Sequence, residues 1–539
     1  MSDMFDTFYD IHNYLFLKDS INKYIIEEID YLKLKKSTAQ FGIYKQRDKK
    51  FMVRIRITGG DLKTELISKL IKIADNHAVN FIHLSSRQAC QLHGINIKEL
   101  FPIFTQCLEE KITFRGGGGD TFRNAAACSH SGFSEDSVFD VLPYAKQTTY
   151  SLFQYEKAFT LPRKFKIAFS CCKNDCSLAK LTDLGFLAKI ENNVKGFEVY
   201  AGGGMGHGSS TGIKLKDFIK SEEVLSYTSA MVDLFDQHGD RNNRNKARIR
   251  FILSKYGEEK FKSLFFEFLK NTPNLAKTTL SKPLSIESLF TKATVEKTSN
   301  NKIIDEKSFH NWQSIAINET KFDNILLVKL FVPFGDLTVE DLKFIHNLFL
   351  QYGITFSRMT RTENLLFPIK KSDLNSVYNT IISHKPIKDF TGSSFNGLIT
   401  ACVGAKTCKI GIINSHKFAN SITKELDEIF KNNEDLKIDC FNTLIESIKV
   451  SGCPNSCSNH LAGPLGFQGI RKKNKNGVPT DYCKIFLGGN HNYINTKAEN
   501  SLVDCNEIGI YVKNLIEKFL IKKEDDSEYK LCDLFKSLY

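Results

Sequence analysis

The chain lacks long hydrophobic runs and a basic start. Its 539 residues contain no uninterrupted apolar stretch of the roughly 18 residues that a membrane helix needs. Three Asp precede the first Lys, Lys18, so the positively charged start of a secretory signal peptide is also missing. We therefore expect a cytoplasmic protein that makes no contact with membranes.

Nucleotide- and nucleic-acid-binding motifs are missing as well. The glycine loop at 202–206, GGGMG, lacks the G-x-G-x-x-G spacing and has no acidic residue at the expected distance, so no flavin or NAD fingerprint is visible. The formal net charge is +13, but the Lys and Arg are dispersed and no helix-turn-helix or RNA-binding signature appears. The charge favours docking of an acidic protein over binding of nucleic acid, although a general richness in Lys and Asn explains part of it.

Cysteine, in contrast, is plentiful. Fourteen cysteines without a secretion signal favour metal ligands and free thiols over disulfides. Cys402 and Cys408 are separated by five residues, and Cys453 and Cys457 by three, within Gly-Cys-Pro-Asn-Ser-Cys. A structural zinc site usually has gaps of two to four residues, so this spacing suits an iron–sulfur cluster better. A set of buried free thiols is the remaining alternative.

The order of motifs in the first half recurs in the second. FMVRIRI at 51–57 has the alternation of a strand, ends at two glycines and is followed by a helical pattern, and NILLVKLFVPFGD from 324 repeats this order. SCCKNDC at 170–176 corresponds to SGCPNSC at 451–457, and EVYAGGGMG to KIFLGGNHN. We therefore predict an α+β fold with an internal duplication and a pseudo-twofold axis.

Cys-x5-Cys followed at a distance by Gly-Cys-Pro-Asn-x-Cys closely resembles the siroheme-dependent sulfite and nitrite reductases. The resemblance implies a 4Fe–4S cluster on Cys402, Cys408, Cys453 and Cys457, with Cys457 also bridging to the siroheme iron. It implies a small ferredoxin-like module and a larger mixed-sheet cofactor module in each half, with siroheme at their junction. The expected boundaries are an N-terminal extension at 1–50, ferredoxin-like modules at 51–112 and 313–385, a linker at 271–312, and siroheme and cluster modules at 113–270 and 386–539.

Four basic residues match the positions at which this family binds its substrate. A lone Lys or Arg is usually a solvated surface charge. Here, however, four occur together in matched motifs, and such groups hold an oxyanion, neutralise charge and donate protons. They are Arg54, Arg123, Lys164 and Lys166. Lys164 and Lys166 are two residues apart on an expected strand, so their side chains should share one face.

Other residues resemble the segments of the family that contact siroheme, whose many carboxylates require a basic pocket. They are Arg56, Arg87, Gln91, His93 and Asn124 in the first half, and Asn364, Asn396 and Asn490 in the second. His83 departs from the pattern, because a close family member would carry Arg there. Cys128, Cys171, Cys172 and Cys176 could form a second cluster, or they are a vestige of the duplication.

The resemblance implies a six-electron reduction of sulfite to sulfide, with nitrite reduction to ammonia as the alternative. Lys166 favours sulfite, because sulfite reductases of the family tend to carry Lys at this place and nitrite reductases Asn. An acidic ferredoxin-like protein would donate electrons, or else a separate flavoprotein subunit. Outside catalysis, the alternative is a cluster-bearing electron-transfer protein without substrate turnover, which would not need the four basic residues.

Overall fold

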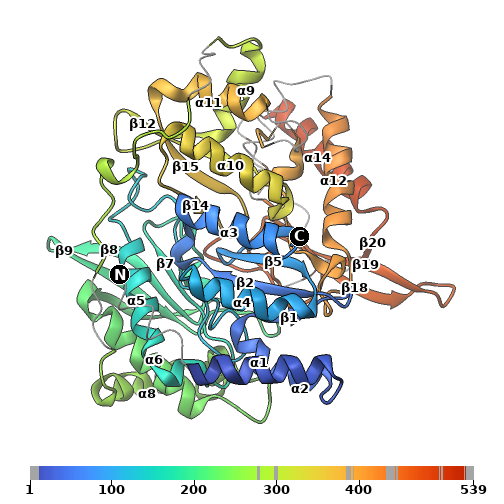
Figure 1. Ribbon diagram of the computed structural model, residues 1–539. Coiled ribbons are helices and arrows are strands. Elements are labelled where there is room, and N and C mark those ends of the chain that lie inside the picture. Colours follow the sequence, from blue (N-terminus) through green and yellow to red (C-terminus); the bar gives the residue numbers. More distant parts are fainter. Residues whose placement is uncertain are drawn as a thin grey trace.

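The computed structural model describes residues 11–275, 280–296, 302–383, 390–392, 394–431, 447–496 and 502–526, with single residues at 444, 498, 529 and 534. Within these residues the strands form four five-stranded sheets, two in each half of the chain (Figure 1). The predicted α+β fold with duplicated halves is confirmed.

The first sheet is the ferredoxin-like sheet of the N-terminal half. Alternating apolar residues and the turn after Leu84 give it two central antiparallel strands joined by a hairpin. In order, its strands are β1 (Ile43–Lys45), β2 (Phe51–Arg56), β5 (Ala89–Ile95), β4 (Phe81–Leu84) and β13 (Asp336–Leu337). The helices of this region are α1 (Ile11–Ile25), α2 (Tyr31–Thr38), α3 (Thr64–Asn76) and α4 (Leu100–Glu109).

The corresponding sheet of the second half repeats this arrangement. Its strands are β11 (Ile317–Glu319), β12 (Ile325–Leu330), β15 (Leu365–Lys370), β14 (Phe356–Met359) and β3 (Asp61–Lys63), and its helices are α9 (Glu306–Ala316), α10 (Val339–Tyr352) and α11 (Leu374–Ser383). Each half thus lends one short strand, β3 or β13, to the sheet of the other half.

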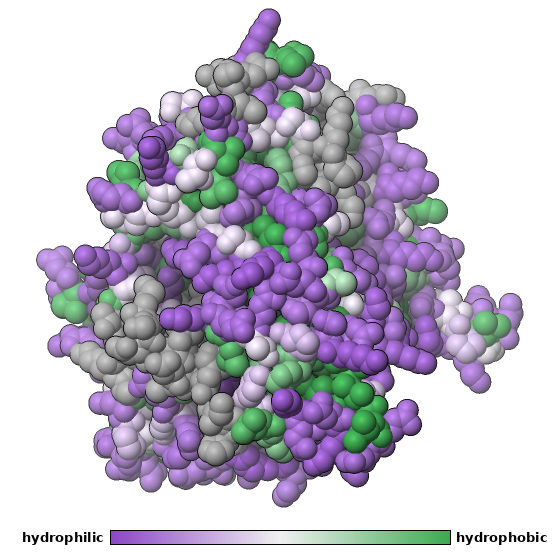
Figure 2. Space-filling model, viewed as in Figure 1, coloured by the Kyte–Doolittle hydropathy of each residue, from purple (hydrophilic) through white to green (hydrophobic). Residues whose placement is uncertain are grey.

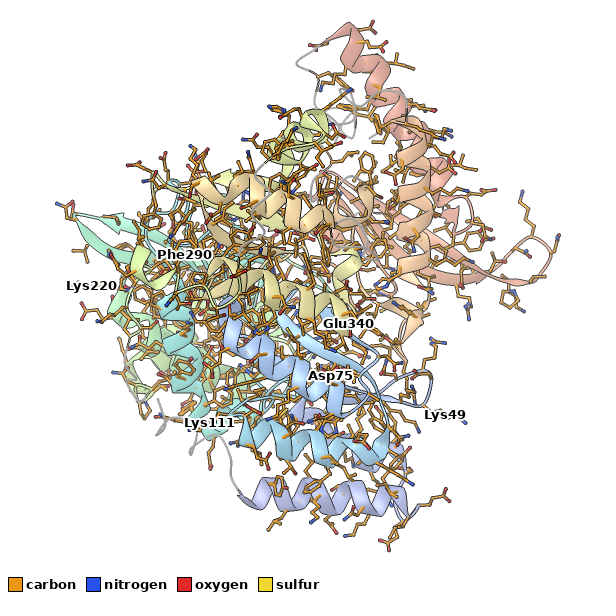
Figure 3. All side chains as sticks on the ribbon, turned by 45° about the horizontal axis from the view of Figure 1, so that its top comes forward. Lys49, Asp75, Lys111, Lys220, Phe290 and Glu340 are labelled. Atoms are coloured by element: carbon orange, nitrogen blue, oxygen red, sulfur yellow. The ribbon has the colours of Figure 1, made fainter. Side chains whose placement is uncertain are left out.

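This exchange of strands joins the two halves. Gly59 and Phe334 both have left-handed backbone (φ 62° and 54°) just before the exchanged strands, which turns the chain toward the other sheet. Helices α3 and α10 lie side by side across the pseudo-twofold (Figures 1 and 3), where Lys343 pairs with both Asp75 and Glu340 at 3.0 Å.

The larger sheets carry the cysteine motifs. One contains β6 (Ala126–Ala127), β7 (Ile167–Ser170), β8 (Leu184–Glu191), β9 (Val194–Ala201) and β10 (Ile213–Lys220), with helices α5 (Leu142–Phe153), α6 (Val224–His238), α7 (Ile249–Tyr256) and α8 (Glu258–Asn271). The other contains β16 (Thr400–Ala401), β17 (Ile448–Ser451), β18 (Leu465–Lys473), β19 (Pro479–Leu487) and β20 (Leu502–Asp504), with helices α12 (Ser415–Ile429) and α14 (Ile508–Asp525).

Both larger sheets pair three strands in parallel and then turn antiparallel. Aromatic packing fixes the first of them, because Phe169, Phe186 and Phe197 are fully buried and the first two stack with centroids 4.8 Å apart. Burying each ring stabilises the fold by about 2–3 kcal/mol. The carboxyl ends of β7 and β17 then present their cysteine loops at equivalent places.

The surface bears few large apolar areas on the face in Figure 2. It is mostly hydrophilic, with hydrophobic side chains gathered near α1 and α2, where Phe16, Ile26 and Leu32 are exposed. No helix within the described residues is long and apolar enough to span a membrane.

Candidate active site

Two loops of the second large sheet carry the four predicted cluster ligands. Cys402 follows β16, and Cys453 and Cys457 follow β17. The backbone N–H of Gly452 donates to Cys402 Sγ (3.2 Å), and Asn455 Nδ2 donates to Cys453 Sγ (3.6 Å). Cys453 is buried whereas Cys457 is exposed, as a ligand shared with a second group would be.

The charge of one thiol affects the pKa of the others. Burial, followed by the charge of Cys457, raises the pKa of Cys402 to about 12 and also raises that of Cys408. Such thiols become thiolates when iron takes the place of their protons. Among the described residues no three His, Cys, Asp or Glu could hold a single metal ion. A four-iron cluster does not require that convergence, because its cysteines bind different irons, so the donor set fits a cluster better than zinc.

Arg54 and Arg123 are held by a glycine-rich loop. Arg54 Nη1 donates to the carbonyl of Gly117 (2.7 Å), while Arg123 donates to the carbonyls of Gly118 (2.8 Å) and Gly119 (2.7 Å). A Cβ on Gly118 would lie 2.2 Å from the Ala39 carbonyl, so the close approach requires glycine. The loop therefore fixes both guanidinium groups before any substrate binds.

Lys164 and Lys166 flank the fully buried Phe165 on the extended segment before β7. The strand itself begins at Ile167, later than predicted, because Phe165 makes only an isolated bridge to Phe122. Because successive side chains of an extended segment point to opposite sides, Lys164 and Lys166 still lie on the side opposite Phe165. Although both side chains are partly accessible, the surrounding protein and then Arg248 lower the pKa of Lys164 to about 7. The surrounding protein and then the charge of Lys164 lower the pKa of Lys166 well below its usual value.

A buried ion pair supports these lysines. Arg248 donates from Nε and Nη2 to the two oxygens of Asp183 (2.9 and 2.6 Å). Asp183 also accepts the backbone N–H of Lys166 (2.9 Å). Since the charge of Arg248 acts on both lysines and that of Cys457 on Lys164, the two lysines and Cys457, a predicted cluster ligand, share one electrostatic site.

Three guanidinium groups have buried donor atoms without a hydrogen-bond partner in the described chain. The Nε and Nη1 atoms of Arg87, Arg250 and Arg361 have no hydrogen-bond partner among the described residues. Arg87 is otherwise fixed by the carbonyls of Asn124 (2.9 Å) and Ile167 (3.1 Å). Buried donors of this kind require acceptors, and the carboxylates of a siroheme would supply them. The residues present therefore fit that group.

Three other predicted siroheme contacts of the first half are also held by neighbouring groups. Arg56 stacks over Phe122 and Phe153 (4.3 and 5.0 Å), and burial lowers its pKa to about 9. Gln91 accepts from Arg54 Nη2 (3.4 Å). Asn124 donates to the carbonyls of Ile57 and Gln88, which leaves its own Oδ1 without a partner in the described chain.

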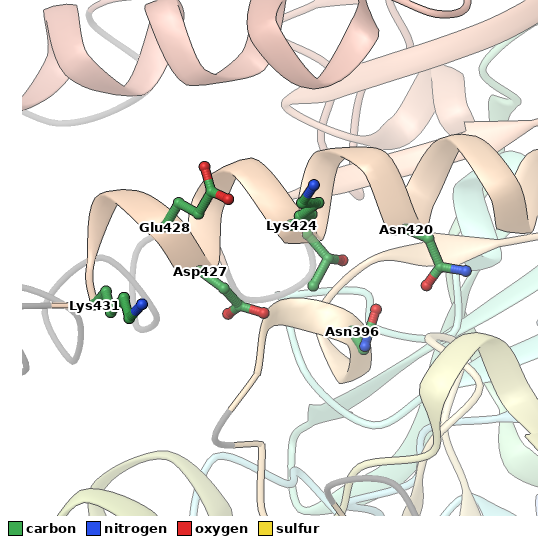
Figure 4. Close-up of a pocket in the computed structure, with 7 residues that line it drawn as sticks. Asn396, Asn420, Lys424, Asp427, Glu428 and Lys431 are labelled. Atoms are coloured by element: carbon green, nitrogen blue, oxygen red, sulfur yellow. The ribbon is translucent and has the colours of Figure 1, made fainter.

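His93 and the second-half asparagines make other contacts. His93 Nδ1 meets Gln46 Nε2 (3.1 Å), and its ring stacks on Phe81. Asn364 accepts from the N–H of Val332 (2.8 Å), and Asn490 caps its own exposed turn. Asn396 faces helix α12 across an open pocket of about 420 Å³ (Figure 4), lined also by Asn420, Thr423, Lys424, Asp427, Glu428 and Lys431. Among the described residues, no hydrogen bond joins Asn364, Asn396 or Asn490 to the basic residues, so their part in siroheme binding stays a prediction.

His83, the departure from the family pattern, is buried on β4. Its Nδ1 lies 2.9 Å from Asp336 Oδ1 of β13, contributed by the other half. The imidazole therefore pairs with Asp336 at the junction of the halves. The donors without a partner in the described chain belong to other residues, Arg361 and Arg250.

The first-half cysteines also gather. Cys128 meets Cys171 and Cys176, and these thiol contacts, followed by burial, raise its pKa well above the usual value. Cys172 in turn meets Cys171 and Cys176. Cys172 and Cys176 stand where the duplication places Cys453 and Cys457, and whether the four thiols hold a cluster stays a prediction.

Sequence reasoning missed Asp183, Arg248, Arg250 and Arg361. Arg248 and Arg250 occur in the pattern KARIRFILSKYG, which indicated only a helix. The available signal in the sequence was the presence of two arginines at the start of an otherwise apolar stretch. The structure buries both almost fully, which is unusual for arginine.

Comparisons with known proteins show which families and folds the chain is similar to. A model of the nitrite and sulphite reductase 4Fe-4S domain matches residues 118–272, and one of the nitrite/sulfite reductase ferredoxin-like half domain matches residues 44–109. The chain is 24% identical over 491 residues to the ferredoxin–nitrite reductase of Synechococcus elongatus, covering 87% of this chain and 86% of that protein. It is 22% identical over 515 residues to the chloroplastic ferredoxin–nitrite reductase of Betula pendula, covering 92% and 82%. The fold is similar to that of the Mycobacterium tuberculosis NirA protein, with a TM-score of 0.76, 20% identity, and coverage of 94% of this chain and 90% of that one.

Proposed function

We propose that the chain is a siroheme- and 4Fe–4S-dependent reductase of the nitrite and sulfite reductase family, and that it reduces nitrite to ammonia with electrons from a ferredoxin-like protein. The observation that carries this choice is the match over most of the chain to relatives named ferredoxin–nitrite reductases. The preference for sulfite that we drew from Lys166 is not confirmed, and nitrite is supported at least as well.

The described residues suit the family's two cofactors. Cys402, Cys408, Cys453 and Cys457 would hold the cluster, with Cys457 shared between cluster and siroheme. Arg87, Arg250 and Arg361 would pair their idle donors with siroheme carboxylates. When bound, siroheme supplies the iron-centred electron transfer to the substrate.

The chain itself supplies positive charge and protons. Arg54 and Arg123, held by backbone carbonyls, would orient the oxyanion and neutralise its charge without rearranging. Lys164 would bind as an ammonium group, and a pKa near 7 lets it give up and regain a proton at neutral pH.

A second candidate substrate is sulfite, and Lys166 is the observation that favours it. Sulfite carries more negative charge than nitrite near neutral pH and must lose three oxygens, so a further cation close to Lys164 would help it more. A role for Lys166 in pairing only with siroheme carboxylates would leave selectivity to other residues.

The test compares both oxyanions in the holoenzyme. Ammonia and sulfide formation would be measured with reduced ferredoxin, for the wild type and for Lys166→Asn. We expect the wild type to have the higher kcat/KM for nitrite, and the variant to lose sulfite reduction more than nitrite reduction. A wild type that makes sulfide efficiently and little ammonia would contradict the proposal.

The proposed donor follows from charge and from the relatives' names. A net charge of +13 would steer an acidic ferredoxin to this surface, and no flavin or nucleotide motif offers an internal route for electrons. A separate flavoprotein subunit is the runner-up, and direct turnover with NADPH alone would exclude both.

A further inference from the structure

The exchanged strands create two matching ion pairs at the junction of the halves. On β14 and β3, Arg358 Nη1 lies 2.5 Å from Asp61 Oδ1. On β4 and β13, His83 Nδ1 lies 2.9 Å from Asp336 Oδ1. The duplication therefore places a permanently charged guanidinium in one pair and a titratable imidazole at the corresponding position of the other.

The turns that follow β4 and β14 also differ in whether they carry a side chain that can titrate. Gln88 and Glu363 occupy corresponding positions, since both have left-handed backbone (φ 56° and 69°) and both donate their N–H to the residue three places earlier. The amide of Gln88 is satisfied, donating to the carbonyls of Ala127 and Met359 (both 2.8 Å) and accepting from the N–H of Ala127 (3.0 Å).

Glu363 is buried but only half satisfied. Its Oε1 accepts from the N–H of Ser86 (3.2 Å), whereas Oε2 has no hydrogen-bond partner in the described chain. Burial and then the charge of Asp336 raise the pKa of Glu363 well above its usual value. A carboxyl group with a free oxygen can both give and take a proton.

His83 lies between the two carboxyl groups. Its Nδ1 meets Asp336, and its Nε2 lies 3.9 Å from Glu363 Oε1, about 1 Å longer than a hydrogen bond. The rings of His93 on β5 and His416 on α12 lie 6.1 and 6.5 Å away. Burial lowers the pKa of both, that of His416 to about 4, so these rings stay neutral. Of the three imidazoles, His83 is therefore the one that lies between the carboxyl groups of Asp336 and Glu363.

This chain of groups has an outer and an inner end. Outside, Asp336 Oδ2 lies 2.7 Å from Nζ of Lys406, whose side chain is 40% exposed, and 3.4 Å from His416 Nδ1. Inside, Ser86 separates Glu363 from Cys457, because its N–H donates to Glu363 and its Oγ donates to the Cys457 carbonyl (2.5 Å). At the matching pair, Asp61 faces Arg358, Lys146 and Lys63, and no imidazole among the described residues pairs with it.

We propose that Asp336, His83 and Glu363 form a relay that carries protons from the surface beside Lys406 to the cofactor end of the site at Cys457. The inference rests on the proposed function. Nitrite, six electrons and eight protons give ammonium and two waters, so the site must import protons while the donor supplies electrons. For each proton that leaves Glu363, His83 passes its Nε2 proton to Glu363 and takes up one at Nδ1 from solvent by way of Asp336, which moves the imidazole proton from Nε2 to Nδ1. A flip of the imidazole ring then returns the proton to the side of Glu363 and restores the relay.

The test uses the holoenzyme with three variants. Glu363→Gln installs the side chain found at the corresponding Gln88, and His83→Arg installs the guanidinium found at Arg358, so both are compatible with the fold. Lys146→Gln, at the matching ion pair, is the control. We expect both relay variants to lower nitrite turnover at least tenfold with little change in KM and an increased solvent deuterium isotope effect. The control should stay within twofold of the wild type.

A second readout does not depend on nitrite. In infrared difference spectra of cofactor reduction, the wild type should show a protonated carboxyl band that shifts in deuterium oxide and is missing from Glu363→Gln. Failure of the wild type to reduce nitrite, with this band present, would remove the proposed substrate and keep the relay. Absence of the band, or full turnover with an unchanged isotope effect in Glu363→Gln, would overturn the relay.

Discussion

Replacing Asp183 by Asn should destabilise the first large module markedly. Asp183 is fully buried and Arg248 is 5% exposed, so the substitution leaves a buried guanidinium without its charge partner. Removing one member of such a pair costs about 3–5 kcal/mol, and two charges about 4 Å apart at an intermediate effective dielectric attract by a similar amount, about 4 kcal/mol. Because an amide oxygen can still accept the N–H of Lys166, we expect about 3 kcal/mol.

Calorimetry of the holoenzyme at a fixed scan rate measures this loss. A transition of a module of this size shifts by about 2–4 °C per kcal/mol, so the first module should unfold about 6–12 °C earlier. Asp120→Asn is the matched control, because Asp120 (30% exposed) pairs near the surface with Arg244 (60%) and Arg163 (26%), and each such pair is worth less than about 1 kcal/mol.

The double variant Asp183→Asn, Arg248→Met separates the charge effect from packing. It should lose less than the sum of the two single losses, since it leaves no buried charge unpaired. An Asp183→Asn shift no larger than that of Asp120→Asn, or strict additivity in the double variant, would refute the reasoning.

Three further outcomes are expected. Cys457→Ser should lose the siroheme absorption, and wild-type iron should be near four per chain beyond the siroheme iron, whereas a value near eight would assign a second cluster to Cys128, Cys171, Cys172 and Cys176. Because the pKa of Lys164 is lowered to about 7, its ammonium form is present below that pH and is lost above it. Nitrite affinity should therefore fall as pH rises through 7, and Lys164→Arg should flatten that dependence, whereas an identical profile in the variant would exclude Lys164 as the group. Turnover with ferredoxin should weaken as salt screens the +13 charge, and salt-independent turnover would argue against charge-steered docking.

The sequence alone determined the duplicated α+β architecture, the cluster motif and the residue types of the basic site. Strand and helix patterns are local, with periods of about 2 and 3.6 residues, so β2, α3, β4 and β5 could be predicted from short stretches. The spacing of Cys453 and Cys457 is equally local, because both thiols leave one loop. The strand expected around Lys164 begins only at Ile167, since backbone pairing, which the pattern does not specify, decides where a strand starts.

The tertiary structure decided which groups from distant segments meet. Nothing local to His83 indicates Asp336, 253 residues away, because the pairing exists only through the exchange of β3 and β13 between sheets. The burial of Arg250 and Arg361 with idle donors is likewise a property of packing, since a lone arginine in sequence is most often solvated. Long-range contacts of this kind depend on how the two halves close on each other, and that closure is driven by apolar surface buried across the whole chain rather than by any one motif.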